Sequence, residues 1–350
     1  MDLLKALGVW EALAPHSAPL KAIRIIDASG GLFRSPDIEF EASELGLPAF
    51  GYNIANDTLA CTLYARAVQT LHAVAPYSVA KIELGAESAR LHCSEGPPLT
   101  ARLVVGADGR RSICRAAANI ATSEWRYDQK AIAASFTHAR PHDNISTELH
   151  RRAGSLTAVP LIDAHASSLV WVGATAEIDA LMQLDASSFA EALEARLGGI
   201  LGKLDAVGTR AAFPVAGLTA KSMAGHRTAL VGEAAHILPP IGAQGLNLGL
   251  RDAAALADCV AAARARGADP GASDVLDAYA QARKLDVFTR AVGVDLLNRS
   301  LLTGFLPLQA ARGVVLSGLN AVPALRRLVM RIGMAPPTAL PSLMRPMPGR

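Results

Sequence analysis

The alternation of apolar and polar residues divides the chain into predicted helices and strands. An amphipathic helix is expected over residues 1–16, where apolar side chains recur at helical spacing. Two strand-like runs follow on either side of Ser29-Gly30-Gly31, a pattern typical of a hairpin. The segment from Asp57 to Gln69 again has the helical pattern, with Asn56 as its expected N-cap. The chain is therefore predicted to begin with a helix, a hairpin and a second helix.

Short apolar runs predict strands in the next part of the chain. Three of them, at 79–84, 89–93 and 99–103, lead into LVVGADG, where a buried strand ends at an Asp-Gly turn. From Tyr127 to Pro214 the pattern becomes that of an antiparallel sheet, with one helix expected near 187–197. A second sheet is therefore expected in the middle of the chain.

A strand, a glycine-rich loop and a long helix follow one another closely after the second sheet. TALVGEAAH predicts a buried strand, PPIGAQG is the loop, and the helix is expected from about Leu246 to Arg264. Gly242 and Gly245 have no side chain, so backbone N–H groups there approach a ligand closely. The start of a helix also carries partial positive charge. We therefore predict an anion-binding site around Gly242, Gly245 and Asn247.

Composition and charge exclude several classes of protein. The chain has 350 residues, of which 51% are hydrophobic and 19% charged, which is enough for a sizeable core. Its 34 basic and 31 acidic residues nearly cancel and are scattered, so a nucleic-acid partner is not supported. The four cysteines form no CxxC pair, which argues against a zinc site, a redox dithiol or a disulfide framework. We expect free thiols in a reducing cytoplasm.

Neither end of the chain predicts export or a membrane span. Charged residues are spaced through residues 1–16, unlike the apolar stretch of a signal peptide. The apolar stretch 301–325 contains Gln309 and Arg312, so it lacks the ~18 uninterrupted apolar residues that a membrane span needs. The leucines and arginines of 296–334 predict either contact with a membrane or partner protein, or an ordinary helical pair. We expect a cytoplasmic location, with peripheral contact at the inner membrane left open.

Two motifs resemble those of a known family. They are GADGRRSICR at 106–115 and VGEAAHILPPIGAQGLNLGLRDAAALAD at 231–258. Both are similar to motifs of the ubiquinone-biosynthesis hydroxylases, a branch of the flavin aromatic monooxygenases related to para-hydroxybenzoate hydroxylase. The resemblance covers nearly the whole chain. It implies an α/β fold in which a Rossmann-like FAD-binding domain, incomplete in this chain, joins an antiparallel-sheet substrate domain.

The resemblance also implies which residues contact the cofactors FAD and NAD(P)H. Gly232 and Glu233 match the segment that contacts the ribityl chain, with glutamate in place of the family's aspartate. Asp108 and Gly109, followed by Ser112 and Arg115, match a motif that helps to bind FAD and the incoming nicotinamide. The cofactor-binding residues implied in all are Asp108, Gly109, Gly232, Glu233, Pro239, Gly242, Gln244, Gly245 and Asn247. No catalytic residue is assigned.

Several other candidate residues are expected to have structural roles. The spacing of the four histidines does not suit a metal site, and their side chains are expected at the surface; they are His138, His142, His150 and His165. Trp171 and Phe213 are expected in the core, as aromatic residues on alternating strands usually are. A lining role in an aromatic-substrate pocket is their alternative.

One expected part of the family's fold has no counterpart in this sequence. The GxGxxG fingerprint is absent, and Ser29-Gly30-Gly31 leads into a strand where the fingerprint needs a helix. The expected division is therefore a partial FAD-binding domain at 1–125, a substrate domain at 126–215, the second part of the FAD-binding domain at 216–300, and a helical region and tail at 301–350. A missing strand-helix-strand unit is expected to expose apolar surface and to weaken FAD binding.

The activity that the resemblance implies is hydroxylation of the aromatic ring of a polyprenylated phenol or quinol, using NAD(P)H and O₂. Two alternatives stay open. One is a non-catalytic relative that acts as a lipid-binding or scaffold component of a biosynthetic complex. The other is a flavin hydroxylase of a soluble aromatic acid.

Overall fold

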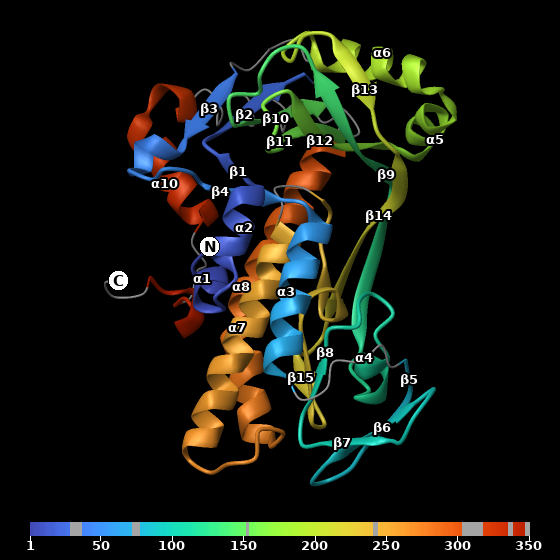
Figure 1. Ribbon diagram of the computed structural model, residues 1–350, viewed down its shortest axis with the longest axis vertical. Coiled ribbons are helices and arrows are strands. Elements are labelled where there is room, and N and C mark those ends of the chain that lie inside the picture. Colours follow the sequence, from blue (N-terminus) through green and yellow to red (C-terminus); the bar gives the residue numbers. More distant parts are fainter. Residues whose placement is uncertain are drawn as a thin grey trace.

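The computed structural model describes residues 1–28, 37–71, 78–151, 154–240, 244–302, 318–334 and 339–346. Its largest layer is a nine-stranded mixed sheet in the order β17-β14-β9-β12-β11-β10-β2-β3, with β13 paired to β9. The strands are β2 (Ala22–Asp27), β3 (Ile38–Glu41), β9 (Thr122–His138), β10 (Ile145–Arg151), β11 (Gly154–Pro160), β12 (Ala166–Ala174), β13 (Leu204–Val207), β14 (Ala211–Ala220) and β17 (His236–Ile237). Figure 1 shows most of this sheet at the top of the molecule, with β9 and β14 continuing down beside the long helices.

The two faces of the large sheet have different partners. The strand registers place Ile132, Trp171 and Leu156 on one face, where they pack against α5 (Thr175–Gln183) and α6 (Ala186–Leu197). The other face carries Ala131 and Val172 and is linked by hydrogen bonds to α8 (Ser273–Leu302). Both faces are therefore covered, and strands buried on two sides need apolar residues at successive positions.

A small parallel unit lies beneath the large sheet. Strands β15 (Ala224–Gly225), β16 (Thr228–Leu230) and β8 (Val104–Gly106) form a sheet in which β16 and β8 run parallel. Helices α4 (Ile113–Ala117), α7 (Gln244–Ala265) and α8 surround a core that includes Leu230, Leu248 and Tyr279. The Tyr279 hydroxyl is buried and donates to the Leu230 carbonyl oxygen at 2.6 Å. This bond fixes α8 against the end of β16.

The remaining elements are short and lie around these two units. Strands β5 (Val79–Leu84), β6 (Ala89–Cys93) and β7 (Leu99–Ala101) form one antiparallel sheet, and β1 (Ser17–Leu20) pairs with β4 (Gly51–Ile54). The helical elements are α1 (Asp2–Ala6), α2 (Trp10–Leu13), η1 (Ala14–His16), η2 (Ala42–Leu45), α3 (Asn56–Thr70), η3 (Gly232–Ala234), α10 (Pro323–Met334) and η4 (Ser342–Met344). Among the described residues, no helix is long and apolar enough to cross a membrane.

Most predicted elements are present, with three differences. The expected helix over 1–16 is two short helices, because Gly8 adopts a left-handed conformation with φ of 70° and ends the first. The N-cap of α3 is Ala55, and Asn56 is its first residue. Helix α5 is additional to the prediction. The expected hairpin forms from β2 and β3, while Ser29-Gly30-Gly31 lies outside the described residues.

The expected domain boundaries fall inside continuous strands. Residues 125 and 126 both belong to β9, and residues 215 and 216 both belong to β14. Strands β2 and β3, from the first expected segment, pair with β10 and so belong to the large sheet. How the chain divides into folding units therefore stays a prediction.

Candidate active site

The two sequence motifs meet at one edge of the small parallel sheet. In the register of β8 and β16, Gly106 lies opposite Leu230, and the Val231 N–H donates to the Gly106 carbonyl oxygen at 2.9 Å. Since the strands are parallel, the residues that follow each of them emerge on the same side. Asp108 and Gly109 therefore lie near Gly232 and Glu233, although more than a hundred residues separate the two motifs.

The Asp108 carboxylate shapes the first motif from within. Its oxygens accept hydrogen bonds from Ser112 Oγ at 2.6 Å and from the Cys114 N–H at 3.1 Å. Partial burial opposes ionisation of Asp108, but these two hydrogen bonds outweigh it and lower its pKa. Burial and the nearby Asp108 charge raise the pKa of the Cys114 thiol to about 12. Asp108 and Ser112 thus hold the turn and the start of α4.

Arg115 joins the two motifs directly. Its guanidinium donates to the carbonyl oxygen of Ala234 at 2.7 Å and to that of Arg110 at 2.8 Å. Ala234 belongs to η3, which contains Gly232 and Glu233. The side chains of Asp108, Ser112 and Arg115 are therefore all bonded within the protein, and their arrangement is that of a scaffold for the site.

The second motif places a turn against the first part of α7. Gly232 has a φ of 59°, which favours glycine, and its N–H donates to Asp252 Oδ2 at 3.0 Å. Gly249 on α7 lies so close that a Cβ built on it is 3.1 Å from the Gly232 Cα. Two glycines in contact thus allow the helix to begin beside the turn, while Glu233 stays exposed at the surface of the site.

A buried network of charged residues supports this arrangement from α8. Asp252 is fully buried and accepts from His236 Nε2 at 2.6 Å and from Arg283 Nε at 2.7 Å. Asp286, also fully buried, pairs with Arg283, and in addition with Arg251 and Arg290. Burial opposes ionisation of Asp286, but the Arg251 charge and its hydrogen bonds lower the Asp286 pKa.

The same network reaches the glycine-rich loop. Arg290 Nη1 donates to Gln244 Oε1 at 2.5 Å, and Gln244 is the first residue of α7. His236 and Gln244 lie within the second sequence motif, whereas Arg283, Asp286 and Arg290 were not predicted to belong to the site. These residues lie on a helix with no motif, where their only sequence signal is charge on an otherwise ordinary amphipathic pattern.

The structure brings most of the predicted cofactor residues together, with one outside the described range. Gly242 belongs to the undescribed residues 241–243, and nothing is concluded about it. Gly245 and Asn247 are exposed at the start of α7, whereas Pro239 is buried. The first N–H groups of a helix have no partner within that helix, and its dipole is positive there. The exposed surface at this point therefore favours an anionic ligand.

One buried atom near this surface has no hydrogen-bond partner among the described residues. His236 Nε2 is hydrogen-bonded to Asp252 Oδ2, while His236 Nδ1 is buried and has no hydrogen-bond partner. In the tautomer that carries its hydrogen on Nε2, Nδ1 is an acceptor. A buried polar atom without a partner is costly, so a ligand or water group that donates to it would stabilise the site.

The face of the large sheet that is turned toward α8 lies over this region. The Tyr127 hydroxyl bonds to Asp295, and Asn298 Nδ2 donates to Gln129 Oε1 at 3.0 Å, so α8 is fixed beneath β9. The register puts Phe213 opposite Ala131 on this same face. Phe213 is 43% exposed, so its expected place in the core is wrong.

Trp171 and the histidines have structural roles that the sequence only partly indicated. Trp171 is 2% exposed on the opposite face of the sheet, which confirms its place in the core. His138, His142 and His150 are buried, so their expected surface position is wrong. The first two bond to backbone carbonyl oxygens, and His150 Nε2 lies 2.9 Å from Glu148 Oε1. Only His165 is exposed as predicted, because it follows a turn at the end of β11.

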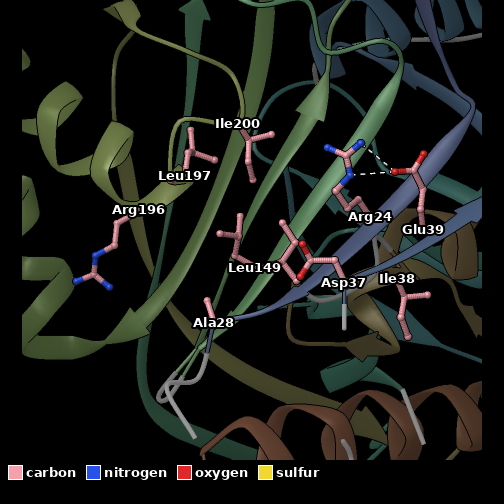
Figure 2. A pocket seen from close by; sticks show the side chains of 11 residues that line it. Arg24, Ala28, Asp37, Ile38, Glu39, Leu149, Arg196, Leu197 and Ile200 are labelled. Carbon is pink, nitrogen blue, oxygen red and sulfur yellow. Dashed lines mark hydrogen bonds and ion pairs between the residues drawn. The ribbon is translucent and has the colours of Figure 1, made fainter. Parts of the chain in front are cut away.

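Two cavities lie near these elements, and one of them reaches the first motif. A cavity of about 480 Å³ lies on the α6 side of the large sheet, away from α8. Figure 2 shows the Arg24–Glu39 ion pair at one end, apolar side chains such as Leu149 between, and Arg196 turned away. A second cavity of about 410 Å³, lined mainly by apolar residues of β5 to β8, reaches Asp108 and Cys114.

Comparison with known proteins agrees with this geometry. Residues 1–292 match the family described as "FAD binding domain". The ubiquinone hydroxylase UbiL of Rhodospirillum rubrum is 35% identical over 95% of this chain and 76% of its own length. The chain belongs to the FAD-binding family of ubiquinone-biosynthesis hydroxylases. A further member, the 3-demethoxyubiquinol 3-hydroxylase of Escherichia coli, is 29% identical over 95% of this chain and 84% of its own length.

Solved structures show the same fold at lower identity. The p-nitrophenol 4-monooxygenase PnpA from Pseudomonas putida has a TM-score of 0.75 and 15% identity, covering 96% of this hydroxylase-family chain and 86% of its own. The Diels-Alderase PyrE3 has a TM-score of 0.72 and 19% identity, and the match covers 97% of this chain and 71% of PyrE3. The predicted para-hydroxybenzoate-hydroxylase-like fold class and the predicted family are both confirmed.

FAD is the cofactor of this hydroxylase family, and part of the site fits it. The fitting part is the exposed edge formed by Gly109, Glu233 and the start of α7, with the unpaired His236 Nδ1 behind it. The described residues do not contain a strand, glycine fingerprint and helix for a dinucleotide pyrophosphate. The fit therefore concerns the flavin ring and ribityl chain.

Proposed function

We propose that this chain is an FAD-dependent monooxygenase that hydroxylates the aromatic ring of a polyprenylated phenol or quinol in ubiquinone biosynthesis. The balanced reaction consumes the ring substrate, O₂, NAD(P)H and a proton, and yields the hydroxylated ring, water and NAD(P)⁺. The observation that carries the proposal is the convergence of both motifs and the start of α7 under an apolar sheet face. When bound, the flavin supplies the oxygen-activating chemistry.

Exposed groups of the second motif are proposed to hold the ribityl chain and the flavin ring. Glu233 is an exposed carboxylate at the sheet edge and accepts from ribityl hydroxyl groups. Gly245 and Asn247 present the positive end of α7 to the pyrimidine edge of the ring, where negative charge develops on reduction. Gly109 leaves room for the cofactor beside Asp108, which holds the turn.

The substrate ring is proposed to lie between the flavin and the sheet face that carries Phe213. That face carries small residues next to Phe213, among them Ala131 and Ala133. Phe213 is exposed there and is suited to stack on an aromatic substrate. Replacing it as Phe213→Ala should raise KM about tenfold, with a smaller change in kcat, because stacking holds substrate and transition state alike.

Flavin binding tests the cofactor part of the proposal. We would measure flavin fluorescence during titration with the wild-type chain, with Gly249→Val and with Gly293→Ala as the matched control. A side chain on Gly249 meets the Gly232 backbone and separates α7 from the turn, whereas a Cβ added to Gly293 meets no atom of another element within 4 Å. We expect at least tenfold weaker flavin binding for Gly249→Val only. Equal affinities for all three proteins would place the flavin elsewhere.

A second titration tests how the adenosine half is held. Among the described residues, β8 pairs with β16 alone, and Val105 on β8 is 45% exposed. We propose that a strand-helix-strand unit at this edge is needed for the pyrophosphate of FAD. The chain should therefore bind riboflavin and FAD with similar affinity. FAD binding more than tenfold tighter than riboflavin binding would contradict this requirement.

The catalytic part is tested with a short-chain prenylated phenol. NAD(P)H oxidation and O₂ uptake are followed together, and the product is analysed by mass spectrometry for one added oxygen. Formation of the hydroxylated ring in proportion to NAD(P)H consumed supports the proposal. Turnover of a soluble aromatic acid with no reaction of the prenylated phenol would favour a different substrate class.

A further inference from the structure

Helix α10 exposes an apolar face to solvent. Leu325, Leu328, Val329 and Ile332 follow at intervals of three, four and seven residues from the first, so they lie on one side of the helix. These side chains are 41%, 52%, 40% and 65% exposed. Helices of soluble proteins turn such a face toward the core, and exposed apolar patches mark interaction sites. The orientation of α10 is therefore opposite to that of an ordinary surface helix.

The rest of the fold holds α10 in this orientation. Met330 on its inner side is 6% exposed and packs with Ile38 and Phe40 of β3. Arg326 pairs with Glu44 of η2 at 2.9 Å, and both side chains are mostly buried. Figure 1 shows α10 at the edge of the molecule, beside β3 and β4. The apolar face is thus fixed outward by contacts made on the opposite side of the helix.

The charges of α10 indicate the chemistry of its partner. The helix contains three arginines and no acidic residue. Arg326 is used in the Glu44 pair, whereas Arg327 and Arg331 are exposed and form no ion pair within the described residues. A short helix with an apolar face and arginines beside it matches an anionic bilayer surface, where the arginine heads reach phosphate and the apolar side chains enter the acyl boundary.

We propose that α10 docks this chain on an anionic phospholipid bilayer, lying in the headgroup layer. The strand registers place Ile25 and Ile38, which pack with Met330, on the same face of the large sheet as Phe213. Docking through α10 therefore places lipid at the β3 edge of the sheet, on the face that carries Phe213 near the other edge. The link between lipid docking and substrate entry rests on the proposed function, whereas lipid binding itself does not.

Vesicle sedimentation tests the proposal without any cofactor. The chain is mixed with vesicles of phosphatidylethanolamine and phosphatidylglycerol, or of phosphatidylcholine alone, and the bound fraction is measured. The variants are Leu328→Glu/Ile332→Glu and Arg327→Glu/Arg331→Glu. The matched control is Tyr64→Glu/Val68→Glu, an exposed apolar pair on α3 at the same spacing. Size-exclusion chromatography with light scattering gives the oligomeric state of each protein.

Substitutions on α10 and on α3 are expected to differ in their effect on vesicle binding. The wild type and the α3 control should bind anionic vesicles, with at least tenfold weaker binding to phosphatidylcholine and at higher salt. Each α10 variant should bind at least tenfold more weakly than the wild type. Equal binding by the Leu328→Glu/Ile332→Glu variant and the wild type overturns the proposal. The proposal is also overturned if the wild type is a dimer that binds no vesicles and the Leu328→Glu/Ile332→Glu variant is a monomer. In that case a second copy of the chain covers the apolar face.

Discussion

Arg283 joins two fully buried carboxylates, so its replacement is the sharpest test of how the site is supported. Its Nε donates to Asp252 at 2.7 Å and its Nη2 pairs with Asp286 at 2.9 Å. Asp252 in turn accepts from the Gly232 N–H in the turn of the second motif. In Arg283→Met the volume is largely kept while both ion pairs are lost, which leaves buried negative charge with fewer partners.

The expected loss of stability follows from the burial. Breaking a buried ion pair by removing one partner costs about 3–5 kcal/mol. An unfolding entropy of roughly 2.1 cal/mol/K per residue gives about 0.7 kcal/mol/K for a chain of 350 residues. The melting temperature of Arg283→Met should therefore fall by about 4–7 °C if the chain unfolds in one step.

Two further variants make the test specific. Arg266 pairs with Asp274 at 2.9 Å, but these side chains are 54% and 66% exposed, so Arg266→Met should lower the melting temperature by about 1 °C or less. Arg283→Lys keeps the charge but cannot reach both carboxylates with a planar group, and an intermediate loss is expected. Calorimetry of the four proteins measures this. A melting temperature for Arg283→Met within 1 °C of the wild type would refute the reasoning.

Three other outcomes are expected. Asp286→Asn should be less stable than the wild type by about 3 kcal/mol at neutral pH. Because the folded-state pKa of Asp286 lies below 3.8, urea unfolding should show this difference shrinking as the pH falls below 3.8, and a constant difference would contradict it. At pH 8 a thiol reagent should label the exposed Cys61 at least tenfold faster than Cys114, whose pKa is about 12. Gly271→Ala should be destabilised by about 1–3 kcal/mol, because its Cβ would lie 1.9 Å from a backbone oxygen, whereas Gly293→Ala should match or exceed the wild type.

The sequence predicted the local elements of the site well, because their signals are short in range. An apolar run followed by Asp-Gly, and a second run followed by a glycine-rich loop and a helix, were both found where the structure has β8, β16 and α7. Strand and helix periodicity depends on neighbours within a few residues. The turn chemistry of Gly8 was missed, since a glycine in a helical pattern is only a weak signal of a helix end.

Burial was predicted less well, because it depends on what packs on each face. Alternation alone does not distinguish Trp171 from Phe213, yet α5 and α6 cover the first and leave the second exposed. The buried positions of His138 and His142 likewise depend on carbonyl groups brought close by neighbouring strands and turns. Such contacts come from residues distant in sequence, and no local pattern encodes them.

By itself the sequence determined the family, the expected cofactor and the two motifs, since these are carried by residue types at fixed spacing. Only the tertiary structure decided that Arg283 and Asp286 support the Gly232 turn, because α8 meets α7 after a loop that no motif marks. It also decided that the apolar side of α10 points outward. An amphipathic helix pattern fixes which residues share a face, and only packing of Met330 and the Arg326–Glu44 pair selects the face that is buried.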